Sequence, residues 1–177
     1  MKILLLSGKA ESGKDTFYSL ARGNSTMSMI YRLAFADEVK KVSKMMGWNG
    51  EKDDNGRSGL IMVGDGARKY FDPNVWINKV IEHLEQFGSS SIVVVTDCRY
   101  PNEIEMLKDW AANRGVDAYA IRIERTNHVS RLTEEQRSNL SEIALDDYGP
   151  WDYIIVNNDG LEEYKDGVKT LLDDILK

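Results

Sequence analysis

The chain has 177 residues, of which 42% are hydrophobic and 29% are charged, and its formal net charge is -6. These values are typical of one globular domain with a full hydrophobic core. The negative charge argues against a general nucleic-acid or membrane-surface binder, which usually has a basic excess, but it leaves room for a local basic pocket that binds a small anion.

Cys98 is the only cysteine of the sequence, so no intramolecular disulfide can form, as is typical of proteins in a reducing cytosol. The apolar run of residues 3–6 is too short for the hydrophobic region of a signal peptide, and no window approaches the length of a membrane span. We therefore expect a single cytoplasmic domain over residues 1–177, with no nucleic-acid or membrane partner.

The first half of the chain alternates between strand and helix patterns. Residues 3–6 form a continuous apolar run that ends at a Gly-rich turn, which predicts a strand buried on both faces. A helix is expected over residues 14–22, and "IYRLAF" is expected to be the second strand. The next helix should start near Asp37, a candidate N-cap. The Gly-rich, polar residues 47–59 predict a mobile surface loop.

The second half continues the alternation. Two helices are predicted in "LIMVGDGARKYF" and "DPNVWINKVIEHLEQF", the second starting at Asp72-Pro73. "SIVVVTD" is the clearest strand, and Pro101 opens the helix after it. "DAYAIRIER" and "WDYIIVNN" are further strands, separated by a polar surface excursion over residues 126–145, and a last helix follows. This order predicts an α/β protein with a mainly parallel sheet.

The stretch "SGKAESGKDTF" has the spacing of a phosphate-binding loop, from Gly8 to Lys14. Such a loop needs glycines for a tight turn, a helix N-terminus facing the anion and a lysine that reaches the outer phosphates. All three occur here in order, after a buried strand. Asp15 stands where such loops usually have Ser or Thr, and Thr16 follows. Either oxygen could meet a hard cation, and Asp15 could equally favour the helix start by its charge alone.

A second cluster follows the strand "SIVVVTD". Asp97 and Arg99 come just past its carboxyl end, the edge at which open α/β sheets bind ligands. An acid there can hold a magnesium-bound water or accept a proton, and an arginine can grip a phosphate. The alternative is a structural pair that caps the next helix. Glu103 is expected to cap that helix, and Cys98 to be inert packing.

Candidate substrate residues are less specific. "GDGARKYFDPNVW" places Arg68 and Lys69 near Trp76, a combination suited to a substrate with a phosphate and a flat ring. The alternative is that Trp76 belongs to the core and that Lys69 is solvated. Asp37 and Lys40 lie one helical turn apart and form a weaker candidate pair.

The polar excursion carries three arginines, Arg125, Arg131 and Arg137. They could close as a lid over transferring phosphates and exclude water, or they could form an ordinary solvated face. His83 and His128 lack the partners expected of a metal site or a triad. The sequence has no Cys/His cluster that would bind zinc.

Together, several stretches resemble the P-loop deoxynucleoside monophosphate kinases of the bacteriophage type and the related animal-type phosphomevalonate kinases. They are "SGKAESGKD", "FADEVK", "GDGARKYFDPNVW", "TDCRYPNE", "LSEIALDD" and "WDYIIVNNDG", which occur in the family's order and span nearly the whole chain. The family's loop also reads GKD, so Asp15 is not a departure. The resemblance implies a three-layer fold like that of nucleoside monophosphate kinases, with a mainly parallel five-stranded sheet and a lid at about residues 125–145.

The resemblance also implies a reaction, the transfer of the γ-phosphoryl group of ATP to a dNMP with Mg²⁺. The residues implied for ATP are Gly8, Lys9, Ala10, Ser12, Gly13, Lys14, Asp15, Thr16, Arg125 and Asn157, with Asp15 and Thr16 also holding the metal. The residues implied for the acceptor are Asp37, Lys40, Arg68, Trp76, Asp97, Arg99, Ser141 and Glu142. The catalytic set is Lys14, Asp97, Arg99 and Arg131, which would act by positioning and charge neutralisation because the acceptor phosphate is already a nucleophile.

Two alternatives remain open at the level of the sequence. A phosphomevalonate kinase would share the fold and the donor but not the acceptor, and the aromatic residues Trp76, Tyr70 and Phe71 favour a nucleobase over mevalonate phosphate. A nucleotide-binding regulator with little transfer activity is the alternative from another class. A homodimer and a phage origin, with the host cytoplasm as location, follow from the resemblance alone.

Overall fold

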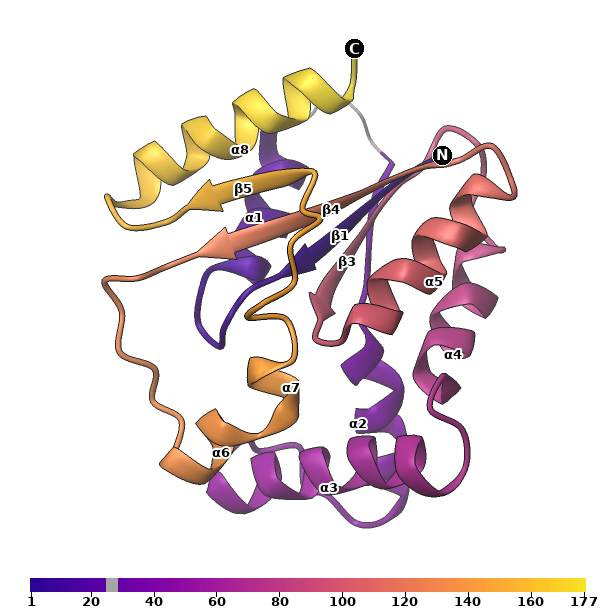
Figure 1. Ribbon diagram of the computed structural model, residues 1–177, viewed down its shortest axis with the longest axis vertical. Helices are drawn as coiled ribbons and strands as arrows, with labels where there is room; N and C mark the ends of the chain where they lie inside the picture. Colours follow the sequence, from indigo (N-terminus) through magenta and orange to yellow (C-terminus); the bar gives the residue numbers. More distant parts are fainter. Residues whose placement is uncertain (25–28) are drawn as a thin grey trace.

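The computed structural model describes residues 1–24 and 29–177. Its centre is a sheet of five strands, all parallel, in the order β2-β3-β1-β4-β5 (Figure 1). The strands are β1 (Lys2–Ser7), β2 (Ile30–Leu33), β3 (Ile92–Cys98), β4 (Asp117–Glu124) and β5 (Tyr153–Val156). The predicted α/β class and five-stranded parallel sheet are therefore confirmed.

β1 lies in the middle of the sheet. Leu5 is in register with Val95 of β3 on one side and with Ala120 of β4 on the other. The four residues of its apolar run are fully buried, as expected of a strand covered on both faces. Because parallel strands end at the same edge, the segment after β1 and the segment after β3 meet at one rim of the sheet.

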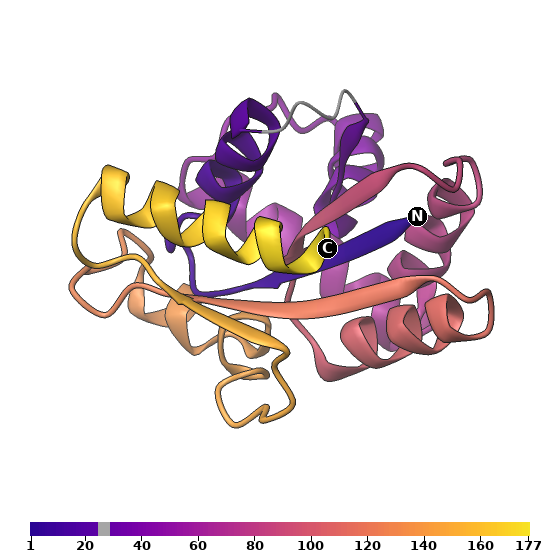
Figure 2. The same cartoon turned by 90° about the horizontal axis from the view of Figure 1, so that it is seen from above.

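The helices of the described residues lie on both sides of the sheet, and Figure 2 shows α5 and α8 on opposite faces. They are α1 (Lys14–Asn24), α2 (Phe35–Met45), α3 (Asp54–Tyr70), α4 (Val75–Leu84), α5 (Pro101–Ala112), α6 (Glu134–Ser138), α7 (Leu140–Ile143) and α8 (Leu161–Ile175). Beyond the carboxyl ends of the strands, α3, α6 and α7 form the end of the molecule that is farthest from the two termini (Figure 1).

Two hydrophobic clusters hold the three layers together. Helices α1 and α8 pack on one face of the sheet, where Phe17 and Val168 meet Leu4. Helices α2, α4 and α5 pack on the other face, where Ile77 and Leu107 belong to the same cluster as Ile3 and Leu5 of β1. The alternating side chains of β1 therefore point into both clusters, so the strand that carries the phosphate loop is fixed from both sides.

The predicted mobile loop over residues 47–59 is wrong in its second half, because α3 begins at Asp54. Asp53 caps this helix, since its side chain accepts a hydrogen bond from the Gly56 backbone N–H at 2.7 Å. A Cβ on Gly56 would lie 2.1 Å from the Glu51 carbonyl oxygen. The glycine therefore permits a close approach of turn and helix here, rather than breaking the helix.

Two helix starts also differ from the prediction. Helix α2 begins at Phe35, and Asp37 is not its N-cap but lies in the first turn, paired with Arg32 and Lys40. Helix α4 begins at Val75 rather than at the Asp-Pro pair. In both cases the acidic side chain bonds to other groups, which the spacing along the chain does not reveal. Asp37 pairs with Arg32 and Lys40, and the Asp72 carboxylate accepts from the Asn74 N–H and the Asn78 side chain.

The polar excursion over residues 126–145 is not wholly a surface segment. It contains α6 and α7, and Gln136 and Leu145 are buried. Thr133 and Gln136 form a capping box at the start of α6, with hydrogen bonds of 3.2 and 3.3 Å. The segment is therefore a folded part of the domain next to the rim.

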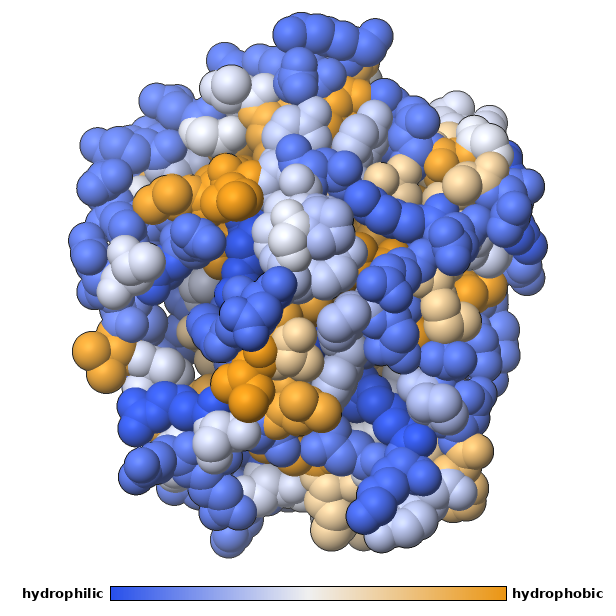
Figure 3. Space-filling model, viewed as in Figure 1, coloured by the Kyte–Doolittle hydropathy of each residue, from blue (hydrophilic) through white to orange (hydrophobic). Residues whose placement is uncertain are grey.

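The face of the molecule in Figure 3 is mainly hydrophilic, with small separate hydrophobic patches. Exposed apolar side chains include Ile154 and Val156 of the edge strand β5. Within residues 1–24 and 29–177, no helix has both the length and the hydropathy needed to cross a membrane.

Candidate functional site

The phosphate loop forms a tight turn between β1 and α1. Gly13 has a φ of 111°, and a Cβ on it would lie 2.5 Å from the Asn157 side-chain nitrogen. A Cβ on Gly8 would lie 2.5 Å from the Ile123 carbonyl oxygen. The two glycines of the motif are thus required by the close approach of β4 and β5, which the sequence pattern alone does not show.

Lys14 turns back over its own loop. Its Nζ donates to the carbonyl oxygens of Gly8 at 2.6 Å and Lys9 at 2.7 Å, and its side chain is largely buried. Burial, and then the neighbouring Arg99, lower the pKa of Lys14 to about 7, although Glu142 and other carboxylates act in the opposite direction. A phosphate would favour the charged form of this lysine, so the environment is one that an anion would stabilise.

The end of the chain braces the loop. The Asn157 side chain donates to the Ser12 carbonyl oxygen at 2.9 Å, and the Tyr164 hydroxyl donates to the Gly13 carbonyl oxygen at 3.0 Å. Arg125 donates to the Glu11 carbonyl oxygen at 3.2 Å. The structure therefore brings Arg125 and Asn157, both expected at the nucleotide, against the loop.

A first cavity, of about 410 Å³, lies on the α8 side of the loop. It is lined by Glu11, Ser12, Gly13, Lys14, Asp15, Thr16, Arg125, Asn157, Asn158, Gly160, Leu161 and Tyr164. We call it the loop cavity. Since it combines the N-terminus of α1, a lysine and polar side chains, it has the groups that bind a polyphosphate and leaves the side of Asn157 for the rest of a nucleotide.

A second cavity, of about 440 Å³, lies on the other side of Lys14, under α3 and α7. It has an apolar wall of Phe35, Val39, Leu60 and Ile61, and its polar lining includes Lys14, Asp15, Lys40, Arg68, Thr96, Asp97, Arg99, Ser141 and Glu142. We call it the rim cavity. The two cavities share Glu11, Lys14 and Asp15, so that two ligands would meet at the loop lysine.

Asp97 holds the start of α2. Its two carboxylate oxygens accept hydrogen bonds from the backbone N–H groups of Phe35 at 2.8 Å and Ala36 at 2.9 Å. Burial raises the pKa of Asp97, although these two N–H donors lower it. The carboxylate also lines the rim cavity, so it combines a structural capping role with a position at the site. The capping alternative from the sequence applies to α2, not to the helix that follows β3.

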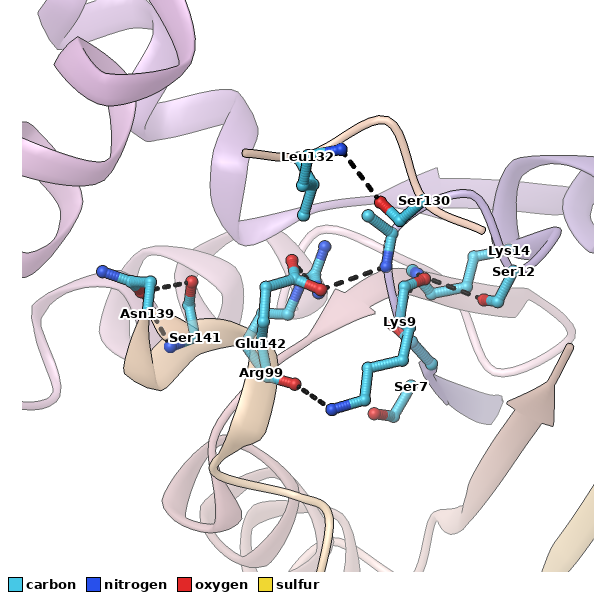
Figure 4. Close-up of polar contacts among 12 residues, drawn as sticks. Ser7, Lys9, Ser12, Lys14, Arg99, Ser130, Leu132, Asn139, Ser141 and Glu142 are labelled. Carbon is cyan, nitrogen blue, oxygen red and sulfur yellow. Dashed lines mark hydrogen bonds and ion pairs between the residues drawn. The ribbon is translucent and has the colours of Figure 1, made fainter. Parts of the chain in front are cut away.

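Arg99 reaches across the rim to α7. Its Nη1 donates to Glu142 Oε1 at 2.6 Å, and Glu142 Oε2 accepts from the Ala10 backbone N–H at 3.1 Å (Figure 4). Ser141, the neighbour of Glu142, is held by Asn139, whose side chain accepts from its N–H and its hydroxyl. The expected Ser141-Glu142 pair is therefore at the site, and Glu142 contacts the loop itself.

Lys9 ties the same segment to the loop. Its Nζ donates to the Glu142 carbonyl oxygen at 2.7 Å and pairs with the Asp146 carboxylate at 2.5 Å. Arg122 lies 3.6 Å from the same carboxylate. We call residues 139–146 the α7 segment. It is thus anchored to the phosphate loop through both its backbone and its side chains.

A buried carboxylate stands behind the rim. Glu103 accepts hydrogen bonds from the backbone N–H groups of Arg99 at 2.6 Å and Tyr100 at 3.1 Å, and from Arg68 at 2.9 Å. Burial raises the pKa of Glu103 to about 7, although Arg68 and the two backbone donors lower it. The expected capping role is confirmed, and Glu103 additionally fixes Arg68, which lies 4.5 Å from the Tyr100 ring centre.

Three cations of the rim cavity were not expected from the sequence, namely Arg32, Lys52 and Arg57. Partial burial lowers the pKa of Lys52, and so do Lys40 and Arg57, while Asp15 opposes the shift. Among the described residues, no carboxylate forms an ion pair with Lys52 or Arg57. The sequence did not indicate Lys52 and Arg57 as site residues, because both lie in the Gly-rich stretch that predicts a surface loop.

Three expected site residues lie elsewhere. Trp76 belongs to the hydrophobic core, with 5% of its surface exposed, and its indole N–H donates to the Gly64 carbonyl oxygen. Asp37 does not line either cavity but neutralises Arg32 and Lys40, which lower its pKa against the opposing effect of burial. Arg131 is exposed and contacts Glu11 through its backbone N–H.

The candidate ligands for Mg²⁺ lie at the start of α1. In the parts of the chain that the structure describes, no three Asp, Glu, His or Cys side chains converge as a metal site. Mg²⁺ commonly binds one or two carboxylates plus substrate phosphates and water, so such a cage is not required. Asp15 and Thr16 both line the loop cavity, and their oxygens fit a metal that is shared with a bound polyphosphate.

No family model and no curated protein sequence matches the chain. Solved structures do. A protein described as a candidate kinase from Chloroflexus aurantiacus has a TM-score of 0.58 at 14% identity, over 99% of this chain and 96% of that one. The APS kinase CysC of Mycobacterium tuberculosis in complex with AMPPNP and APS has a TM-score of 0.55 at 11% identity, over 99% and 98%.

Kti12 of Chaetomium thermophilum in complex with ADP-AlF3 also has a TM-score of 0.55, at 12% identity and over 97% of both chains. The fold is that of the P-loop kinases. The likeness extends over nearly the full length of this chain and of each of these neighbours.

Proposed function

We propose that this protein is an ATP-dependent phosphotransferase whose acceptor is itself a small phosphorylated molecule, with a dNMP as the first choice. The observation that carries the proposal is the pair of cavities that meet at Lys14 and Asp15. A donor polyphosphate in the loop cavity and an acceptor phosphate in the rim cavity would face one another across this lysine. The neighbours with AMPPNP, APS or ADP-AlF3 support a nucleotide as the ligand of the loop cavity.

The chemistry needs no covalent intermediate. The acceptor phosphate oxygen attacks the γ-phosphorus of ATP, the bond to the β-γ bridging oxygen breaks, and ADP leaves, giving dNDP. Lys14 and Arg99 neutralise the charge on the transferred group, and Asp15 with Thr16 would hold Mg²⁺, which supplies further charge neutralisation when bound. Catalysis then rests on positioning and electrostatics, which the rigid strand ends provide.

The rim cavity supports a dNMP through its apolar wall. Phe35, Val39 and Ile61 lie opposite the polar groups, and a flat, largely apolar base could pack on them. The aromatic residues that favoured a nucleobase in the sequence do not contribute, because Trp76 is in the core and Tyr70 is 74% exposed outside the cavity. The preference for a base therefore rests on the apolar wall alone.

One observation favours a second candidate, phosphomevalonate kinase. Lys52 and Arg57 line the rim cavity without a carboxylate ion-pair partner in the described residues. Mevalonate 5-phosphate has a carboxylate in addition to its phosphate, and two free cations would suit that second anion. A dNMP has no such group.

A coupled ADP-release assay over dNMPs, NMPs and mevalonate 5-phosphate tests the proposal. We expect acceleration by at least one dNMP. Acceleration with mevalonate 5-phosphate alone would replace the first choice by the second. Tight ATP binding without acceleration by any acceptor would instead favour a nucleotide-binding regulator.

Arg99→Ala in the same assay tests the assigned site. We expect turnover to fall by roughly 10²-fold or more while the fold is retained, because the arginine acts on charge that develops in the transition state. Lys69→Ala, a change at an exposed residue outside both cavities, is the control. Near-normal turnover of a folded Arg99→Ala variant contradicts the role.

A further inference from the structure

An internal carboxylate occupies the point where the loop and Arg99 face one another. Glu142 accepts from the Ala10 N–H through one oxygen and from Arg99 through the other (Figure 4). Only 11% of its side chain is exposed. A loop N–H and a guanidinium are the groups with which proteins bind phosphate oxygens. The geometry is therefore that of an anion site filled by the protein's own anion.

The location of this site separates it from the rest of the loop. Ala10, Arg99 and Glu142 line the rim cavity, whereas Ser12, Gly13 and Thr16 line the loop cavity, and Lys14 lines both. The groups of the loop cavity would suit a diphosphate, and a further phosphate that extended past Lys14 toward the acceptor would be the one to meet the Ala10 N–H and Arg99.

We propose that Glu142 is the residue by which the site distinguishes a nucleoside triphosphate from a diphosphate. The proposal rests on the proposed function, since it takes ATP as the ligand of the loop. The outermost phosphate and the Glu142 carboxylate compete for the same two donors, and two anions cannot share them without strong repulsion. ADP leaves the pair intact, whereas ATP displaces Glu142.

Displacement of Glu142 also loosens the α7 segment, residues 139–146. It removes the hydrogen bond between Glu142 and the Ala10 N–H, while the contacts of Lys9 with the Glu142 backbone and the Asp146 side chain remain. We therefore expect this segment to be held less tightly in the ATP complex than in the ADP complex, where all of these contacts are kept.

Titration calorimetry with Mg²⁺ and no acceptor tests the competition, using ADP and the ATP analogue AMPPNP. Glu142→Gln keeps the size of the side chain and removes its charge. We expect it to raise the affinity for AMPPNP roughly tenfold, the effect of weakening one charge-assisted competitor, and to change that for ADP less than about twofold. The matched control is Glu135→Gln, an exposed residue of α6 with no side-chain hydrogen bond in the described residues.

Other outcomes overturn the proposal. Equal affinity changes for both nucleotides, or no change, exclude a competition confined to the outermost phosphate. A loss of AMPPNP affinity in Glu142→Gln would mean that Glu142 positions Arg99 for the nucleotide and does not compete with it. Absence of any nucleotide binding by the unaltered protein refutes the proposed function as well, whereas binding with an unchanged preference refutes only this inference.

Hydrogen exchange on the unaltered protein gives a second test that does not depend on a variant's folding. We expect the amides of residues 139–146 to exchange faster with saturating AMPPNP than with saturating ADP, because only the triphosphate removes the Glu142 side chain from the loop N–H. Equal protection in the two complexes would falsify the coupling.

Discussion

Lys14 has a buried ammonium group whose hydrogen-bond acceptors are all uncharged, namely two carbonyl oxygens and the Ser12 hydroxyl. Its Nζ contacts the Gly8 and Lys9 oxygens, and its pKa is lowered to about 7 by burial and by Arg99. The loop therefore holds its lysine near the point of losing a proton. An arriving phosphate shifts the balance toward the charged form, so binding is coupled to proton uptake.

This coupling predicts a pH dependence of nucleotide affinity. Only protonated Lys14 attracts phosphate, and in the free protein it loses its proton as the pH rises through about 7. Between pH 7.5 and 9 we expect AMPPNP affinity to fall with rising pH, by up to about tenfold per pH unit. Titration calorimetry at a fixed Mg²⁺ concentration measures the AMPPNP affinity at each pH. Lys14→Arg, which stays charged throughout this range, should flatten the profile, and a flat profile in the unaltered protein contradicts the coupling.

The elements around the site show what the sequence could and could not predict. The apolar run of β1, the glycines of the loop and the strand β3 are local patterns, and each lies where it was expected. The cavity walls are not local. Lys52 lies before α3, and its position in the rim cavity depends on how α3 folds back over α2, which no spacing along the chain encodes.

Trp76 is the opposite case, since an aromatic residue beside two cations suggested a ligand site. It belongs to α4 and packs in the core against α3, because its ring is apolar and its N–H donates to the Gly64 carbonyl oxygen.

Asp97 lies where the sequence predicted, but it has a bonding role that the sequence did not predict. Its position at the rim follows from β3. Its carboxylate bonds to two N–H groups of α2 that are 61 and 62 residues away in the sequence.

Helix α3 contacts Trp76 through the Gly64 carbonyl oxygen and lines the rim cavity with Leu60, Ile61 and Gly64, which gives an element-level prediction. Trp76→Phe removes the hydrogen bond to Gly64, and we expect the free energy of unfolding to fall by about 1–2 kcal/mol while the KM for the acceptor is unchanged. Ile61→Ala, on the cavity wall, should raise the acceptor KM several-fold. Chemical denaturation and steady-state kinetics separate the two effects. A large rise in acceptor KM for Trp76→Phe would show that Trp76 contributes to acceptor binding.

At the scale of the whole molecule, the two cavities draw on every layer of the fold. The loop cavity is made by the phosphate loop, α1, the segments after β4 and β5, and α8, whereas the rim cavity includes residues of the phosphate loop, α2, α3, β3 and α7. Ligands that fill them therefore bind only the folded chain, and their binding free energy adds to its stability.

Thermal unfolding should report this directly. A nucleotide at 100 times its Kd adds about 2.7 kcal/mol, which for a domain of this size corresponds to a rise in Tm of about 5–10 °C. We expect a second, smaller rise when the correct acceptor is added to the AMPPNP complex, measured by scanning calorimetry. If mevalonate 5-phosphate gives this second rise and no dNMP does, the acceptor assignment changes accordingly.

The bracing of the phosphate loop by Asn157 and Tyr164 has a consequence for the biosynthesis of the protein. Residues 8–14 form the loop, yet the strand before it pairs only with β3 and β4, and the Ser12 and Gly13 carbonyl oxygens are held by Asn157 and Tyr164. A nascent chain that extends only to α4 has neither support. The loop therefore gains its native support only after residues 92–164 have also been synthesised and folded onto it.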